Sequence, residues 1–206
     1  MTPRSVDPAD SVAALPTSEP DHDPPDGVLI GGREHVPIVV VDADGQWPQR
    51  YGLVRERVRT ALGPSALRVE HIGSTSAPGL AAKPIIDVLV TVQDVEDEAA
   101  FVPQLERAGF VLRVREPEHR MVRTPARDVH VHLYEPDHEA VSAYLDLRDW
   151  LRVDADDRAL YERTKRLLAT RTWTDMNEYA DAKTDVVLAV LGRARAWRAA
   201  QEPTAT

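Results

Sequence analysis

The chain has 206 residues, a formal net charge of −9 and no cysteine. This length suits one domain with a sizeable core, and the lack of cysteine excludes a disulfide framework and a thiolate metal site. The acidic balance argues against a polynucleotide partner, because phosphate contacts require clustered Lys and Arg. The sequence shows neither an apolar run of transmembrane length nor a signal-peptide layout, so we expect a cytoplasmic protein that does not bind a membrane.

The N-terminal segment differs in composition from the rest of the chain. Residues 1–26 contain six acidic residues, one basic residue and six of the 16 prolines. Such a segment cannot bury a core, so we expect a disordered acidic tail, which is either a solubilising extension or a docking arm. We expect a single domain over residues 27–199 and a frayed C-terminus over 200–206.

The first half of this domain alternates strand-like and helix-like patterns. Apolar periodicity, Gly and Pro mark the boundaries, and Trp47 anchors the first helix. The expected elements are an edge strand over 38–41, a helix from Trp47 to Gly63, a strand over 67–72, a helical turn over 78–82, a helix over 95–108 and a strand over 110–114.

The stretch HIGSTSAPGLAAKPIIDVLVTV, residues 71–92, contains the strongest functional signal. Gly73 permits close backbone approach to a ligand, and Ser74, Thr75 and Ser76 supply hydroxyls beside backbone amides. Asp87 lies within an otherwise apolar strand, and a buried charge requires a partner or a cation. A loop of small residues followed by a strand acid suits phosphate and divalent-metal chemistry. His71, on the core face of the strand before this loop, is either a satisfied core histidine or part of the site.

A second candidate strand runs over DVHVHLY, residues 128–134. Strict alternation places Asp128, His130, His132 and Tyr134 on one face. Two histidines at i and i+2 can bind one metal ion, and neutral imidazole is a common ligand. If this strand lies in one sheet with Asp87, the side chains of Asp87, His130 and His132 would form a metal site.

The segment before this strand is rich in arginine, and the segment after it is helical. The arginines form either a solvated face or a rim that attracts an anionic substrate: Arg113, Arg115, Arg120, Arg123 and Arg127. From residue 137 onward the apolar spacing predicts three helices, the last over 175–199.

The run HIGSTS-PGL-AKPIIDV resembles the GrpB-like family, which is placed in the nucleotidyltransferase superfamily. The resemblance covers most of residues 37–195. It continues in VDAD (41–44) before Trp47-Pro48, HVHLYE (130–135), LRDWLR (147–152), Tyr161 with Lys165, and YADAK (179–183).

The resemblance implies an α/β (α+β) fold with a mixed, nucleotidyltransferase-like sheet, flanking helices and a helical C-terminal section. In the superfamily a Gly-Ser loop holds phosphates and strand carboxylates hold divalent metal. Gly73 and Ser74 match the loop and Asp87 matches the first carboxylate. Leu89 stands where the second acid is expected, and His130 and His132 lie where a third would be sought.

Three functions follow from these residues. The first is transfer of a nucleotidyl or phosphoryl group to a small molecule. Asp87 would hold Mg²⁺ or Mn²⁺, the 73–76 loop and Lys83 would hold phosphates, and His130 or His132 would act as base or ligand. Matching family positions, Lys165, Tyr179 and Lys183 would close the pocket, although surface lysines and core tyrosines are common.

The second function is a catalytically silent nucleotide- or anion-binding module, which Leu89 favours because a metal-binding acid is missing. The third is a hydrolase with Zn²⁺, Mn²⁺ or Ni²⁺ held by His71, Asp87, His130 and His132. All three expect a phosphate-bearing small molecule, a nucleotide or a divalent metal as ligand. The sequence indicates no oligomeric state.

Overall fold

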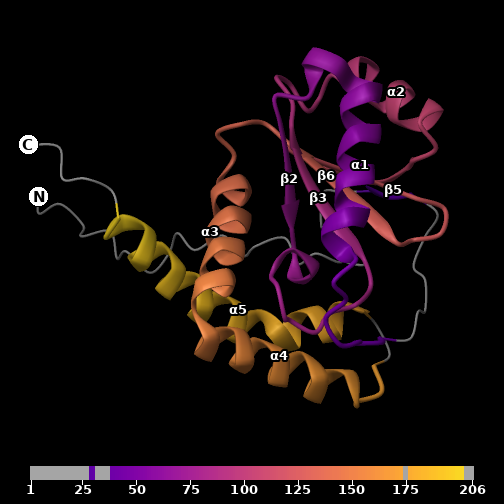
Figure 1. The fold of residues 1–206 in the computed structure, drawn as a ribbon. Helices are drawn as coiled ribbons and strands as arrows, with labels where there is room; N and C mark the ends of the chain where they lie inside the picture. Colours follow the sequence, from indigo (N-terminus) through magenta and orange to yellow (C-terminus); the bar gives the residue numbers. More distant parts are fainter. Residues whose placement is uncertain (1–27, 31–37, 174–175, 202–206) are drawn as a thin grey trace, which may run out of the picture.

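The computed structural model describes residues 28–30, 38–173 and 176–201, and the expected acidic tail lies outside them (Figure 1). A six-stranded sheet forms the centre in the order β1-β4-β5-β6-β3-β2. β3 and β6 pair in parallel, and the other described neighbours pair antiparallel. The strands are β1 Val28–Leu29, β2 Arg68–Ile72, β3 Ile86–Thr91, β4 Val111–Glu116, β5 His119–Arg123 and β6 Val129–Tyr134.

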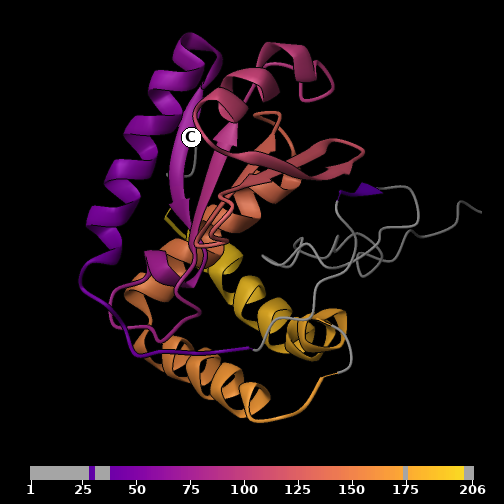
Figure 2. The same ribbon diagram turned by 90° about the vertical axis from the view of Figure 1, so that its right-hand side faces the viewer.

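Helices cover both faces of this sheet. The α-helices are α1 Trp47–Leu62, α2 Val102–Arg107, α3 Glu139–Val153, α4 Ala155–Ala169 and α5 Met176–Ala199. Figures 1 and 2 show α1 and α2 on one face, α3 on the other, and α4 with α5 across one end. The mixed sheet with flanking helices and a helical C-terminal section confirms the expected fold class.

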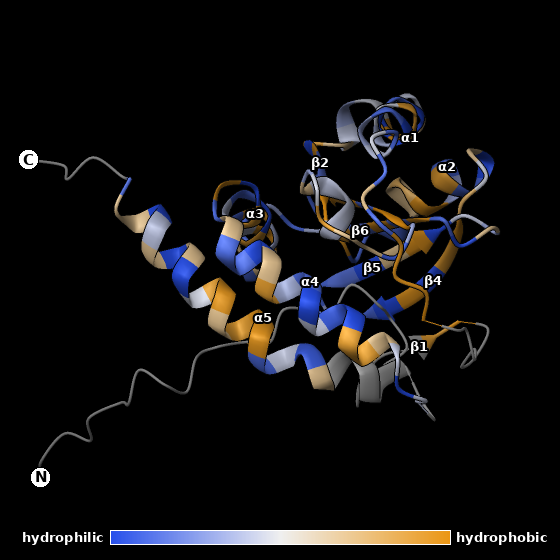
Figure 3. Cartoon of the chain, turned by 60° about the horizontal axis from the view of Figure 1, so that its bottom comes forward, coloured by the Kyte–Doolittle hydropathy of each residue, from blue (hydrophilic) through white to orange (hydrophobic). Residues whose placement is uncertain are grey.

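The core has two layers because β3 and β6 alternate side chains between both faces. Every residue of β3 and β6 is buried, as expected for strands covered on both sides. On the α1 side, Trp47 and Val58 pack with Val88 and Val131 in the largest cluster. On the α3 side a smaller cluster joins the sheet to α3 and α5. Middle residues of α5 are apolar in Figure 3, and Val190 and Leu191 there are fully buried.

Several expected elements differ from the structure. The edge strand over 38–41 is wrong, because only Val41 forms a bridge, to Ala82. The helical turn over 78–82 is also wrong. A 3-10 turn forms earlier, at Ser74–Ser76, and the bridge holds Ala82 extended. The helix over 95–108 is shorter, because Pro103 marks the start of α2 and the preceding turn at Glu98–Ala100 is 3-10.

The arginine-rich segment does not form a free basic rim. Arg113 and Arg120 are buried, and Arg120 pairs with Glu96 and Glu98. Arg115 also pairs with Glu98, at 2.6 Å. These pairs neutralise part of the positive charge that an anionic substrate would require. Among the described helices, none combines the length and apolarity needed to cross a membrane.

Candidate functional site

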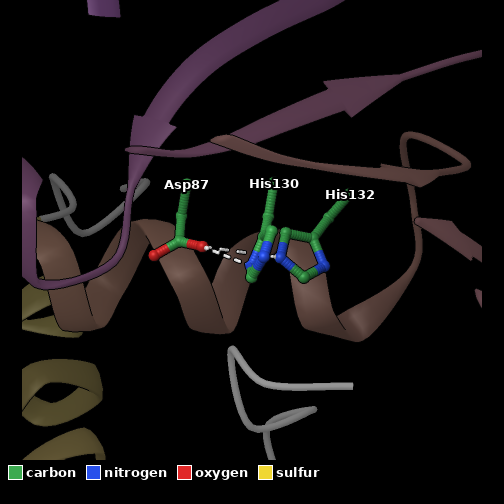
Figure 4. A group of neighbouring side chains, drawn as sticks. All are labelled: Asp87, His130 and His132. Carbon is green, nitrogen blue, oxygen red and sulfur yellow. Dashed lines mark ion pairs between the residues drawn. The ribbon is translucent and has the colours of Figure 1, made fainter. Parts of the chain in front are cut away.

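Asp87, His130 and His132 converge on the α3 face of the sheet. The parallel register sets Asp87 opposite His130, and His132 lies two residues further along β6 on the same face. The Oδ1 atom of Asp87 lies 3.6 Å from His130 Nδ1 and 3.9 Å from His132 Nε2. Figure 4 shows the three side chains pointing toward one another from adjacent strands. We refer to them as the triad.

The triad has the geometry of a metal site. One nitrogen or oxygen of each residue lies within 4.8 Å of the other two. Each of these atoms is buried and has no hydrogen-bond partner among the described residues. Buried polar atoms are normally satisfied, and leaving one unsatisfied costs about 1–3 kcal/mol. A cation between them would satisfy all three, so the residues fit a divalent metal.

The protonation states also suit a metal. Burial opposes ionisation of Asp87, but hydrogen bonds and charge from the two imidazoles in their protonated forms outweigh it and lower the pKa of Asp87 to about 2. Burial lowers the pKa of His130, although Asp87 opposes this. At neutral pH the site therefore presents a carboxylate and a neutral His130 imidazole, which are the forms that bind metal.

The donor set favours a transition metal over Mg²⁺. Two imidazoles and one carboxylate suit ions such as Zn²⁺, Fe²⁺ or Ni²⁺, whereas Mg²⁺ requires near-octahedral oxygen ligation. Leu89 shares this face but is fully buried in the apolar cluster with Tyr134 and Tyr144. No second strand carboxylate is therefore available at this position.

Gly73 brings the loop against Asp87. Its φ of +68° is a conformation that L residues rarely adopt. A Cβ on Gly73 would overlap Asp87 Oδ2 and lie 3.0 Å from Asp87 Cβ and Cγ. The close approach that the sequence indicated is therefore to the carboxylate of Asp87 in the triad.

The loop hydroxyls divide into two groups. Thr75 Oγ1 donates to the Ile85 carbonyl and Ser76 Oγ donates to the Gly73 carbonyl, so both hold the loop together. Ser74 is less buried, and its Oγ accepts from Lys165 Nζ at 2.8 Å. Of the three expected phosphate-binding hydroxyls, Ser74 is the one that the structure places beside a cation.

Helices α3 and α4 hold this loop against the sheet. Arg152 Nε of α3 donates to the Ser76 carbonyl at 3.0 Å. Glu162 of α4 accepts from the Ala81 amide at 3.1 Å, and Lys165 donates to the Ala81 carbonyl at 2.6 Å. The motifs around residues 147–152 and 161–165 therefore position the loop.

Lys83, Lys165 and Lys183 each interact electrostatically with Asp87, and they are all the lysines in the chain. Burial and the charge of Lys183 lower the pKa of Lys83 and of Lys165 to about 7. Burial lowers the pKa of Lys183 to about 8, while Asp87 opposes the shift in all three. The structure thus brings these three expected residues together. Tyr179 lies in α5, and its side chain is outside the described residues.

His71 does not join the triad. The β2–β3 register pairs His71 with Val88 and Ile72 with Asp87, so His71 lies on the opposite face of the sheet. Its Nε2 lies 3.1 Å from Thr75 Oγ1, and its ring stacks on Tyr51 at 4.5 Å. These contacts make it a satisfied core histidine that lies outside the triad.

The buried position of His71 predicts a pH effect on stability. Burial lowers its pKa to about 4 in the folded protein, below the usual 6.5. Between these values the unfolded chain binds the proton and the folded protein does not, so stability falls as the pH falls. We expect His71→Gln to weaken this dependence by up to about 1.4 kcal/mol per pH unit. Urea unfolding of both proteins between pH 4.5 and 7 measures it, and equal slopes would contradict it.

Two residues beside the triad were not indicated by sequence reasoning. His119 Nε2 lies 3.3 Å from His132 Nδ1, and His119 Nδ1 lies 2.6 Å from Glu116 Oε2. Both come from the β4–β5 hairpin, in which Glu116 is paired with His119. The alternating positions of His119, Met121 and Arg123 in the sequence could have predicted strand β5.

Comparisons with known proteins identify the family of the chain. A family model described as GrpB protein matches residues 37–193. A UPF0157 protein of Streptomyces coelicolor is 55% identical over 170 residues, covering 82% of this chain and 91% of the relative.

Solved structures give two further similarities. The conserved protein GrpB from Enterococcus faecalis has a TM-score of 0.69 and 29% identity, covering 77% of this chain and 99% of the other. A structure of the Cid1 poly(U) polymerase with Mg 3′-dATP has a TM-score of 0.49 and 15% identity, covering 65% of this chain and 44% of the polymerase.

Proposed function

The chain belongs to the GrpB family, and we propose that it is a metal-dependent enzyme that moves a phosphoryl or nucleotidyl group to a small molecule. Asp87, His130 and His132 hold the divalent cation. Ser74, Lys83, Lys165 and Lys183 hold the phosphates of the ligand. A bound metal neutralises charge that develops on the phosphate oxygens, so the protein mainly positions the groups and supplies fixed positive charge.

The gathering of every lysine of the chain around the triad is the observation that carries this proposal. The chain otherwise uses arginine, with 25 basic residues of which three are lysine. All three lysines interact with the buried carboxylate of Asp87, which raises the pKa of each, so basic groups outnumber acidic groups at the site. Burying positive charge is costly, and an anionic ligand offsets that cost. Perturbed pKa values of this size are also typical of functional sites.

Hydrolysis of a phosphate-bearing small molecule is a second candidate, because the triad contains two imidazoles and Leu89 excludes a second strand carboxylate. A Zn²⁺ or Mn²⁺ ion held this way would lower the pKa of a bound water and so supply a nucleophile at neutral pH. The phosphate-binding lysines would serve the same purpose in both reactions. The two candidates differ in whether water or another small molecule accepts the group.

A ligand screen based on the lysines tests the proposal. Reductive methylation with ¹³C-formaldehyde labels the three lysines and the α-amino group, so almost every NMR signal reports on the site. We expect nucleoside triphosphates or other phosphate esters, added with Mn²⁺ or Zn²⁺, to shift the three lysine signals. Product analysis then separates transfer from hydrolysis. Binding without product in any mixture would favour the silent binding module, and unshifted lysine signals across purine and pyrimidine nucleotides would reject the proposal.

Lys165→Met should weaken phosphate binding on the order of 10- to 100-fold, because a hydrogen bond to a charged group contributes about 1.5–3 kcal/mol. Lys165 Nζ already contacts Ser74 Oγ, so its loss removes the cation nearest the loop. Arg163→Met on the same helix removes one exposed positive charge and serves as the matched control. Calorimetric titration with the phosphate ligand found in the screen measures both variants. Equal affinities in the two would count against a phosphate role for Lys165.

A further inference from the structure

We propose that Glu116 and His119 set the tautomer of His132, so that its Nε2 presents a lone pair to the metal. Both act as positioning residues through hydrogen bonds and do not touch the metal. This inference rests on the proposed metal site.

The hydrogen bonds between Glu116, His119 and His132 determine which ring nitrogen of each histidine carries the proton. An ionised carboxylate can only accept hydrogen bonds. Glu116 Oε2 therefore accepts a hydrogen bond from the Nδ1–H group of His119, and the two heavy atoms are 2.6 Å apart. In a neutral imidazole the other nitrogen is then an acceptor, so His119 Nε2 accepts from His132 Nδ1 across 3.3 Å. His132 therefore carries its proton on Nδ1, and its Nε2 lone pair faces Asp87.

This arrangement explains why two acceptors face each other in the core. His132 Nε2 and Asp87 Oδ1 are 3.9 Å apart, and neither has a hydrogen-bond partner among the described residues. Without the hydrogen bonds from Glu116 through His119, His132 could carry its proton on Nε2 and donate it to Asp87. That hydrogen bond would satisfy both groups and block metal binding. The hydrogen bonds that link Glu116, His119 and His132 disfavour this tautomer of His132.

Packing holds His119 in place for this task. His119 is 5% exposed and lies between the site and the hairpin end. Its ring stacks on Tyr134 with centroids 4.5 Å apart and an interplanar angle of 7°. The rings of His119 and His132 are within 9° of parallel, and Glu116 is partly exposed at the rim. The hydrogen bonds from Glu116 through His119 to His132 thus connect the partly exposed end of the hairpin to the buried triad.

Tautomers can be read directly in the metal-free protein. Long-range ¹H–¹⁵N correlation of the histidine rings shows which nitrogen carries the proton. We expect His132 to be protonated on Nδ1 in the natural protein, and to become a mixture in Glu116→Ala and in His119→Phe. His132 protonated on Nε2 in the natural protein would overturn the inference.

Zn²⁺ affinity gives a second readout. Loss of an outer hydrogen bond to a metal-binding histidine typically lowers metal affinity 10- to 100-fold. We expect that loss in Glu116→Ala and His119→Phe, with recovery in His119→Gln, whose carbonyl can accept from His132. Glu135→Ala removes an exposed acid just beyond β6 and should bind Zn²⁺ within twofold of the natural protein.

The outcomes separate this inference from the proposed function. Unchanged tautomer and unchanged Zn²⁺ affinity in His119→Phe would refute the positioning role. Failure to find a phosphate ligand would refute the proposed function and leave the tautomer measurement intact. Loss of Zn²⁺ binding with an unchanged Nδ1–H on His132 would show that His119 acts through packing, and would also overturn the inference.

Discussion

Asp87→Asn is expected to lower Zn²⁺ affinity by at least about 100-fold, more than the loss of an outer-shell partner causes. Asparagine keeps the shape of the side chain but removes the only carboxylate of the triad. The same change should lower the pKa of Lys83, Lys165 and Lys183 further, because Asp87 raises the pKa of each. Calorimetric titration with Zn²⁺ measures the first effect, and pH titration of the methylated lysines measures the second.

Asp128→Asn is the matched control for this experiment. Asp128 lies next to β6 and carries the same charge, but it is exposed and accepts from Thr124 Oγ1 at 2.6 Å. The variant should bind Zn²⁺ like the natural protein. If Asp87→Asn retains Zn²⁺ affinity within threefold, the triad is not the metal site.

Gly73→Ala is expected to destabilise the fold by about 2–6 kcal/mol and to abolish metal binding. Backbone strain at positive φ costs about 1–3 kcal/mol, and overpacking adds about 1–3 kcal/mol. The added methyl group would overlap the carboxylate of Asp87, so either the loop or the metal ligand must move. Chemical denaturation and Zn²⁺ titration measure the two effects.

Gly79→Ala separates the two causes. Gly79 also has a positive φ, +79°, but its Cβ would meet nothing within 4 Å. The Gly79→Ala variant should therefore lose only the stability that backbone strain costs, and it should bind Zn²⁺ as tightly as the natural protein. In the Asp87→Ala background, Gly73→Ala should cost less than it does alone, because the carboxylate is gone. Additive costs in this double-mutant cycle would show that the two residues do not interact.

The part of the site that sequence could predict lies within single elements. Asp87 is recognisable as an acid in an apolar strand, and the alternation of His130 and His132 places both on one face regardless of the sheet around them. Lys165 and Lys183 required the family resemblance, because nothing local distinguishes Lys165 from any helical lysine, whereas Lys83 stands just before the strand that carries Asp87. The fold class followed from the alternation of strand and helix patterns.

The remaining features depend on pairing between distant segments. His71 could be assigned to a face of β2, but only the β2–β3 register shows that this face is opposite to that of Asp87. The series of hydrogen bonds from Glu116 through His119 to His132 requires the pairing of β5 with β6, which the sequence did not indicate. The roles of Thr75 and Ser76 depend on the 3-10 turn, whose geometry directs their hydroxyls to loop carbonyls.

The parallel pairing of β3 with β6 has a consequence for how the protein folds. It joins residues 43 positions apart, Asp87 and His130, whereas the β2–β3 and β4–β5 pairs are closer in sequence. Contacts with such long loops form slowly, because loop closure is costly before the contact is made. The proposed metal ligands should therefore come together late in folding, and a polypeptide stalled before that step would have its hairpins but no affinity for Zn²⁺. In a refolding time course, the appearance of Zn²⁺ binding would mark the pairing of β3 with β6.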